Sequence, residues 1–90
     1  MQNSYKQLFS QFSSCGIYNI STRAFEGLES SLTHLNLQDN KLSSIPTEAI
    51  SSLSSLTQID LSKNQITNIP SGAFKGPPLN TLKVNIVCFL

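Results

Sequence analysis

Apolar and polar residues alternate in two short segments of the chain, and further apolar positions follow each segment. The first runs over residues 32–42 as Leu-Thr-His-Leu-Asn-Leu-Gln-Asp-Asn-Lys-Leu, and the second runs over residues 56–66 as Leu-Thr-Gln-Ile-Asp-Leu-Ser-Lys-Asn-Gln-Ile. Alternation with a period of two is typical of a strand that buries one face. Each segment therefore predicts a short strand, with inward residues such as Leu35 in the first and Ile59 in the second. The same pattern predicts interior positions for Ile69 after the second strand and for Leu82 in a third.

The two segments are copies of one unit, because Leu32 and Leu56 lie 24 residues apart and similar residue types follow both. Each copy continues with an Ile-Pro pair, at residues 45–46 and 69–70. A repeat of this length indicates units that stack, since one unit cannot bury its apolar face alone. Stacking places the strands in one parallel sheet, and the rest of each unit supplies the long crossover that parallel strands need.

Both copies fit the pattern Leu-x-x-Leu-x-Leu-x-x-Asn-x-Leu, with isoleucine at some leucine positions. The chain thereby resembles the leucine-rich repeat family. The Ile-Pro pairs, followed by Ala-Ile at residues 49–50 and Ala-Phe at 73–74, resemble the typical 24-residue extracellular subclass found in Toll-like receptors, Slit-like proteins and small proteoglycans. The resemblance implies an α/β repeat solenoid, an arc with a parallel concave β-sheet and a convex side of irregular segments, 3₁₀ turns or short helices.

The match weakens toward both ends of the chain. We expect an irregular or degraded N-terminal edge over residues 1–11 and a C-terminal end over 85–90 that does not match. Between them we expect about three leucine-rich repeats over residues 12–84, with the best fit at 32–76. Extracellular members usually carry cysteine-rich caps, and none flanks these repeats. The resemblance therefore implies an uncapped fragment of a longer chain that carries further repeats or caps.

Two asparagines, Asn40 and Asn64, interrupt the apolar pattern where the chain turns off each predicted strand. Such a turn leaves buried backbone groups that need hydrogen-bond partners. An asparagine amide carries donors and an acceptor, so it can satisfy them. We predict a structural ladder of these residues, as the resemblance also implies, and alignment of the preceding repeat places Cys15 at the same position.

The polar residues between the inward leucines face the concave side of the predicted sheet, where we expect a protein partner to bind. They form three lateral rows, which are His34, Gln58 and Thr81; Asn36, Asp60 and Lys83; and Gln38 and Ser62, with Asn85 continuing the third. The two well-matched repeats place no aromatic residue there, although aromatic and arginine anchors usually dominate interface energy. An alternative is therefore that this segment only spaces or extends the solenoid.

The sequence offers no catalytic, cofactor-binding or metal site. His34 is the single histidine, and Asp60 and Lys83 have neither a nucleophile nor a second acid beside them, so the requirements of an active site are not met. No histidine, cysteine and carboxylate cluster has the spacing of metal ligands. There is also no glycine-rich phosphate loop. We predict a non-enzymatic protein without a cofactor.

Charge and hydropathy exclude further classes of partner. A net charge of +1 and a charged fraction of 12% give no electrostatic basis for binding nucleic acid or an anionic membrane. No apolar run is long enough to span a bilayer, and residues 1–7 lack the features of a signal peptide.

Stacked strands would hold Cys15 and Cys88 about 14 Å apart. A disulfide needs Cα atoms within about 7 Å, so we expect none.

These observations favour a protein–protein interaction module. The resemblance implies an extracellular or cell-surface ectodomain, with roles in receptor signalling or adhesion. The alternative is a cytoplasmic location, where the repeats dock or space a multidomain signalling protein of the kinase or cyclase type whose chemistry lies elsewhere. Asn19 begins the single N-x-S/T sequon of the chain, Asn19-Ile20-Ser21, and is a candidate glycosylation site if the protein is secreted.

Overall fold

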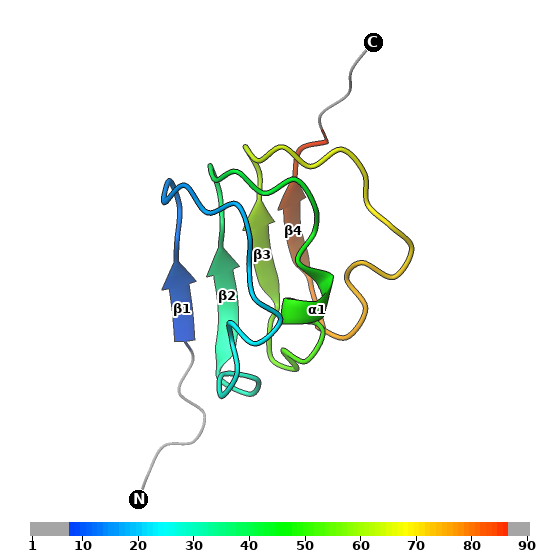
Figure 1. Cartoon of the computed structure of the whole chain (residues 1–90). Coiled ribbons are helices and arrows are strands. Elements are labelled where there is room, and N and C mark those ends of the chain that lie inside the picture. The colour runs from blue at the N-terminus through cyan, green and yellow to red at the C-terminus, as the bar shows by residue number, and fades with distance from the viewer. Residues whose placement is uncertain (1–7, 87–90) are drawn as a thin grey trace, which may run out of the picture.

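Four parallel strands lie side by side in chain order in the computed structural model, which describes residues 8–86 (Figure 1). They are β1 (Leu8–Gln11), β2 (Leu32–Asn36), β3 (Gln58–Leu61) and β4 (Thr81–Val84). Within the described residues the helix is α1 (Thr47–Ile50), a single turn that lies on one side of the sheet among irregular segments. We call this side convex and the opposite side concave. The arrangement confirms the predicted solenoid with a parallel sheet.

The N-terminal strand β1 lies inside the segment 1–11 for which the sequence predicts an irregular or degraded edge. It pairs with β2 through Phe9 opposite His34 and Ser10 opposite Leu35. The register shifts between Leu8 and Phe9, so the pairing is not regular over its whole length. Residues 8–11 thus supply a neighbouring strand, although they lack the leucine pattern. The proposed boundaries of the repeats stay a prediction.

A continuous apolar core fills the space between the sheet and the convex segments. The inward residues of β2 and β3, such as Leu35 and Ile59, are almost fully buried, as predicted. The side chains with the least exposure are Leu32, Leu35, Leu37, Ile50, Leu53, Leu56, Ile59, Leu61 and Ile66. Burial of each such side chain stabilises the fold by roughly 1.5–3 kcal/mol. This core is therefore the main source of stability of the solenoid.

Burial fails in the last turn, where the sequence predicts interior positions for Ile69 and Leu82. These side chains are 44% and 42% exposed. Leu82 lies opposite Ile59 in the register of β3 and β4, so it belongs to the same face of the sheet. The difference is that Ile59 has a neighbouring strand on each side, whereas β4 is the last strand of the sheet within residues 8–86. Periodicity thus identifies the inward face correctly but overestimates burial at the edge.

The two segments that follow Pro46 and Pro70 are equivalent in the repeat but differ in conformation. Residues 47–50 form α1, where the amide of Ser51 donates to Thr47 O at 3.0 Å. Residues 71–74 form only tight turns, because Lys75 N donates to the carbonyl of Gly72 three residues earlier at 3.1 Å. Gly72 has a φ of 76°, which interrupts helical geometry. The convex side is therefore mostly irregular.

Gly76 allows two convex segments to approach each other. Its φ is +114°, and a Cβ at this position would overlap the carbonyl oxygen of Ser51 and lie 3.1 Å from the carbonyl carbon. We expect Gly76→Ala to lower the free energy of unfolding by about 2 kcal/mol or more. The positive φ alone costs a residue with a Cβ about 1–3 kcal/mol, and the backbone must also move to remove the overlap with Ser51. Urea unfolding followed by circular dichroism measures the change.

Gly27 provides the matched control for this substitution. Its φ is also positive, +93°, but a Cβ there would meet no atom within 4 Å. Gly27→Ala therefore reports the cost of the backbone conformation without the overlap. If the two variants lost equal stability, the close approach of Gly76 to Ser51 would contribute nothing and the explanation would be wrong.

Candidate concave binding surface

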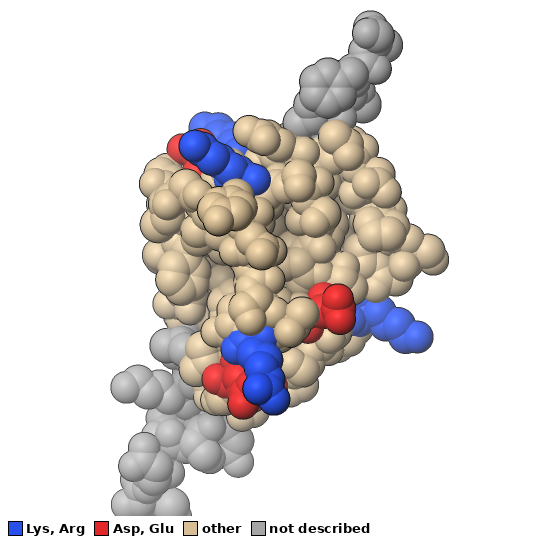
Figure 2. Space-filling view, viewed as in Figure 1, with Lys and Arg blue, Asp and Glu red and all other residues tan. Residues whose placement is uncertain are grey.

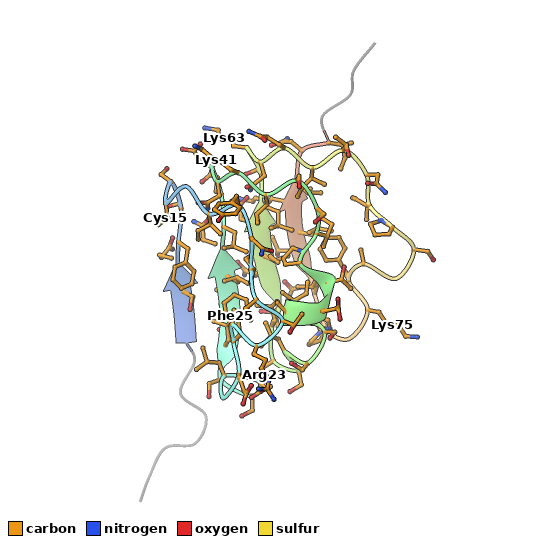
Figure 3. The ribbon with its side chains drawn as sticks, viewed as in Figure 1. Cys15, Arg23, Phe25, Lys41, Lys63 and Lys75 are labelled. Carbon is orange, nitrogen blue, oxygen red and sulfur yellow. The ribbon has the colours of Figure 1, made fainter. Side chains whose placement is uncertain are left out.

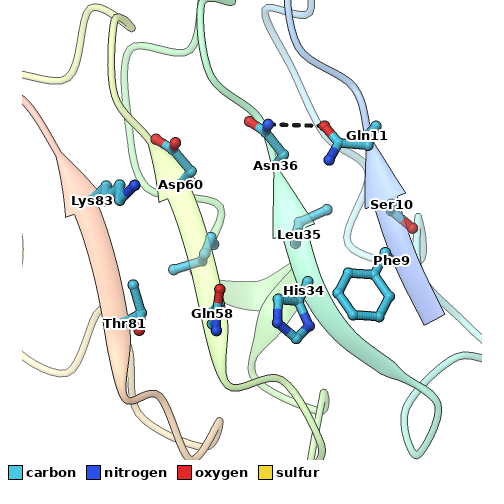
Figure 4. A pocket seen from close by; sticks show the side chains of 11 residues that line it. Phe9, Ser10, Gln11, His34, Leu35, Asn36, Gln58, Asp60, Thr81 and Lys83 are labelled. Atoms are coloured by element: carbon cyan, nitrogen blue, oxygen red, sulfur yellow. Dashed lines mark hydrogen bonds between the residues drawn. The ribbon is translucent and has the colours of Figure 1, made fainter. Parts of the chain in front are cut away.

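The strand register brings the first two predicted polar rows together. His34 lies opposite Gln58, and Gln58 lies opposite Thr81. In the second row, Asn36 lies opposite Asp60 and Asp60 opposite Lys83. Figure 4 shows these side chains from the side of the sheet opposite to that in Figure 1. Both rows lie on one rigid parallel sheet, which fixes the spacing of their polar groups.

The third predicted row lies beyond the strand ends. Gln38 follows β2 and Ser62 follows β3, and both are half-buried. The backbone continues the lateral pairing here, because Asp39 N donates to Ser62 O at 3.0 Å. Asn85 joins this edge by accepting a hydrogen bond at Oδ1 from Lys63 N at 3.0 Å. These residues extend the concave side but take part in turn structure.

Strand β1 adds two side chains to the concave side that the predicted rows do not include. Phe9 stacks on His34, with ring centroids 4.0 Å apart and an angle of 21° between the planes. Gln11 accepts a hydrogen bond at Oε1 from Asn36 Nδ2 at 2.9 Å. The signal was present, because the alignment that places Cys15 at the position of Asn40 also places Phe9 and Gln11 at the positions of His34 and Asn36. The concave face thus has an aromatic residue, and Phe9 is 55% exposed.

Local hydrogen bonds orient the middle row. Asn36 Oδ1 accepts from Gln38 N at 2.9 Å, and Asp60 Oδ1 accepts from Ser62 N at 3.0 Å. A side chain that bonds the amide two residues later forms a turn characteristic of Asn and Asp. Ser62 Oγ also donates to Asp60 Oδ1. The second carboxylate oxygen of Asp60 has no hydrogen-bond partner among residues 8–86, so it is available to a ligand.

Asp60 and Lys83 are neighbours, as the sequence predicts, but they do not form an ion pair. They lie opposite each other in the register of β3 and β4. The ion pair found within the described part of the chain joins Arg23 Nε to Glu26 Oε2 at 3.3 Å. Hydrogen bonds from Ser62 hold one carboxylate oxygen of Asp60, and an exposed pair with Lys83 would add at most about 1 kcal/mol. Both charges therefore remain available for a partner.

The concave residues line a shallow hollow of ≈ 190 Å³ (Figure 4). Its walls are Phe9, Ser10, Gln11, His34, Leu35, Asn36, Gln58, Ile59, Asp60, Thr81 and Lys83. Pockets for small molecules usually enclose about 300–1,000 Å³ and bury most of the ligand. The hollow is smaller and open, so its geometry suits contact with a surface rather than enclosure of a small molecule.

Asn40 bridges two turns of the solenoid. Its Nδ2 donates to Phe12 O at 2.9 Å and to Leu37 O at 3.0 Å. Its Oδ1 accepts from Cys15 N at 3.0 Å and from Ile17 N at 2.9 Å. The side chain is 6% exposed. One amide therefore satisfies backbone groups of its own turn and of the preceding turn, which is the geometry that a structural ladder requires.

Asn64 repeats this arrangement in the next turn. Its Nδ2 donates to Leu37 O at 2.9 Å and to Leu61 O at 3.0 Å, and its Oδ1 accepts from Leu42 N at 3.0 Å. Cys15 has the equivalent place, but its side chain is exposed and its Sγ contacts Ser13 O in the same turn at 3.4 Å. Cys15 is a free cysteine, and the predicted absence of a bridge to Cys88 concerns a residue outside the described range.

Two further findings on the described residues concern metal binding and membrane insertion. No group of three or more histidine, cysteine or acidic residues between residues 8 and 86 has the geometry to hold a metal ion. In the same part of the chain, no helix has the length and hydrophobicity to cross a bilayer. Charged side chains on the convex face form small groups of mixed sign, separated by uncharged surface (Figure 2). This face has no extended patch of one charge.

Comparison with known proteins agrees with the geometry. A family model described as leucine rich repeat matches residues 12–66 and 30–85, which together include more than half of the chain. No curated protein and no solved structure gave a significant match. Repeats of this kind generally mediate protein–protein interaction and are typically non-enzymatic. The repeated register, the buried asparagines and the family match together show that the chain belongs to the leucine-rich repeat family.

Proposed function

We propose that the chain forms part of an extracellular or cell-surface ectodomain that binds a protein partner on its concave face. The observation that carries this proposal is the set of polar and aromatic groups held in register on the sheet. Phe9 and His34 form an aromatic surface at one end of the hollow, and Asp60 and Lys83 carry separate charges toward the other. A protein surface with apolar and charged groups at matching spacing complements this arrangement.

The extracellular placement rests on the resemblance of the Ile-Pro and Ala-Phe positions to the typical subclass. The proposed binding mode rests on the rigidity of the strands, because pre-positioned side chains lose less conformational freedom when a partner binds. The neutral balance of the face indicates that shape and specific hydrogen bonds, rather than long-range attraction, select the partner. Contact by residues on the convex side is the competing arrangement.

Photo-crosslinking distinguishes the two arrangements. A photoreactive amino acid at Gln58, an exposed residue in the middle of the first row, should crosslink the protein to one dominant partner in intact cells. The same amino acid at Asn68, an exposed residue in the irregular segment between β3 and β4, is the matched control and should give no such product. A dominant product from Asn68 alone would contradict concave binding.

Charge substitutions then measure the contribution of the middle row to binding of the crosslinked partner. Asp60→Asn keeps an oxygen that can accept from Ser62 N but removes the charge, and Lys83→Ala removes the other charge. We expect the double variant to bind about tenfold more weakly, which corresponds to about 1.4 kcal/mol. Titration by surface plasmon resonance measures the affinity, and an unchanged affinity would contradict a contribution of the middle row to binding.

A further inference from the structure

We propose that Asn19 is an N-glycosylation site whose glycan covers the convex side of the solenoid. The inference rests on the proposed passage of the protein through a secretory compartment. The sequon Asn19-Ile20-Ser21 supplies the acceptor amide and the hydroxyl two residues later that this modification requires. These residues lie outside the proposed partner-binding surface, so partner binding does not explain the motif.

The structure presents both reactive positions of the sequon to solvent. Asn19 and Ser21 are exposed, while Ile20 between them is partly buried and packs against the core. Ile20 therefore anchors the segment and leaves the two flanking side chains accessible. The segment has no regular secondary structure, so no strand or helix must open before a transferase binds it. It crosses the convex side between Cys15 and Arg23 (Figure 3).

The hydrogen bonds separate Asn19 from the asparagines with structural roles. The amides of Asn40 and Asn64 are buried and bonded to backbone groups, so they are unavailable for modification. The Asn19 side chain makes no hydrogen bond within residues 8–86. Ser21 Oγ accepts from Arg23 N at 3.2 Å, which leaves the hydroxyl proton of Ser21 free to donate. Asn68 is also exposed, but Pro70 stands where its sequon would need a hydroxyl residue.

The chemistry requires a polyprenyl diphosphate-linked oligosaccharide as the donor, together with a transferase. The Asn19 amide nitrogen forms a bond to C1 of the first sugar, and the bond from C1 to the diphosphate oxygen breaks. The polyprenyl diphosphate leaves with that electron pair, and the amide nitrogen loses one proton to a base of the transferase. The product is a neutral amide-linked glycan, so the net charge of the chain does not change.

The convex surface around Asn19 has room for the first sugars. Asn19 lines a hollow of ≈ 400 Å³ together with Tyr18, Ile20, Pro46 and Thr47. Tyr18 is 78% exposed and offers an apolar ring face next to the attachment point. No residue of this hollow lines the concave hollow. A glycan here would cover exposed aromatic surface and leave the proposed partner-binding face open.

The test uses the full chain produced in the secretory pathway of eukaryotic cells. Trypsin releases residues 7–23 as one peptide, because Lys6 and Arg23 bound it, and this peptide contains the single sequon. Peptide-N-glycosidase converts a glycosylated asparagine to aspartate, so mass spectrometry reads occupancy directly. We expect most of the peptide to carry aspartate in place of Asn19 after treatment, and the intact protein to migrate faster on a gel once the enzyme has removed the glycan.

Two variants and one control assign the site. Asn19→Gln and Ser21→Ala should each abolish the gel shift, while Asn68→Gln, at an exposed asparagine outside a sequon, should retain it. An unmodified peptide 7–23 from secreted wild-type protein, or a shift that survives Asn19→Gln, would overturn the proposal. Neither readout involves the partner, so loss of the glycan and loss of concave binding are independent results.

Discussion

Replacement of Asn64 by leucine is expected to lower the free energy of unfolding by about 3 kcal/mol or more, although the two side chains are similar in size. Asn64 satisfies the amide of Leu42 and the carbonyls of Leu37 and Leu61, all in buried surroundings. Each buried backbone group left without a partner costs about 1–3 kcal/mol. Leucine adds apolar surface but offers no hydrogen bond, so the loss exceeds the gain. Urea unfolding followed by circular dichroism measures the difference.

Asn68→Leu is the matched control, because Asn68 is exposed and lies only four positions away in the same turn. Its change should stay within about 0.5 kcal/mol, as is usual for surface substitutions. A second variant, Asn64→Cys, introduces a cysteine, which the chain already has at the equivalent position of an earlier repeat, Cys15. A thiol is a weak donor and a weak acceptor. This variant should be less stable than wild type. If Asn64→Leu were as stable as Asn68→Leu, the buried hydrogen bonds would not stabilise the solenoid.

The concave rows show what the sequence can predict. Because the unit repeats at a fixed spacing, equal positions must lie side by side, and Asn36, Asp60 and Lys83 do so. The same logic places the buried asparagines next to the strand ends. These features depend on backbone geometry that the repeat imposes, so one chain with two good copies is enough to predict them.

Other features depend on contacts that periodicity does not describe. Asp60 and Lys83 lie opposite each other without forming an ion pair, and Ser62 instead bonds one carboxylate oxygen of Asp60. The stack of Phe9 on His34 involves a strand without the leucine pattern, so the repeat motif does not predict it. Ile69 is exposed because burial depends on a covering neighbour and not on residue type alone. These features depend on competition between side chains and on position at the edge of the sheet, so the repeat pattern alone does not predict them.

Ile59→Ala, which truncates a core side chain, is expected to lower the free energy of unfolding by about 2–5 kcal/mol. Ile59 is 1% exposed at the centre of β3, with β2 on one side and β4 on the other. Removal of a buried aliphatic side chain loses its transfer free energy and leaves a cavity that the neighbours fill only in part. Urea unfolding compared with wild type at several protein concentrations measures this loss and shows whether association contributes.

Leu82→Ala is the control that tests the edge effect, because Leu82 lies opposite Ile59 on the neighbouring strand and is 42% exposed. In a stacked solenoid, stability is approximately a sum of the intrinsic stabilities of the repeats and the contacts between neighbours. Truncation at β3 weakens the contacts with both neighbours, whereas truncation at β4 weakens the contact with β3 alone among the described strands. We therefore expect Leu82→Ala to cost less than about 1 kcal/mol. Equal, concentration-dependent losses in the two variants would mean that a second molecule buries Leu82 in solution, and equal losses independent of concentration would contradict the exposed position of Leu82.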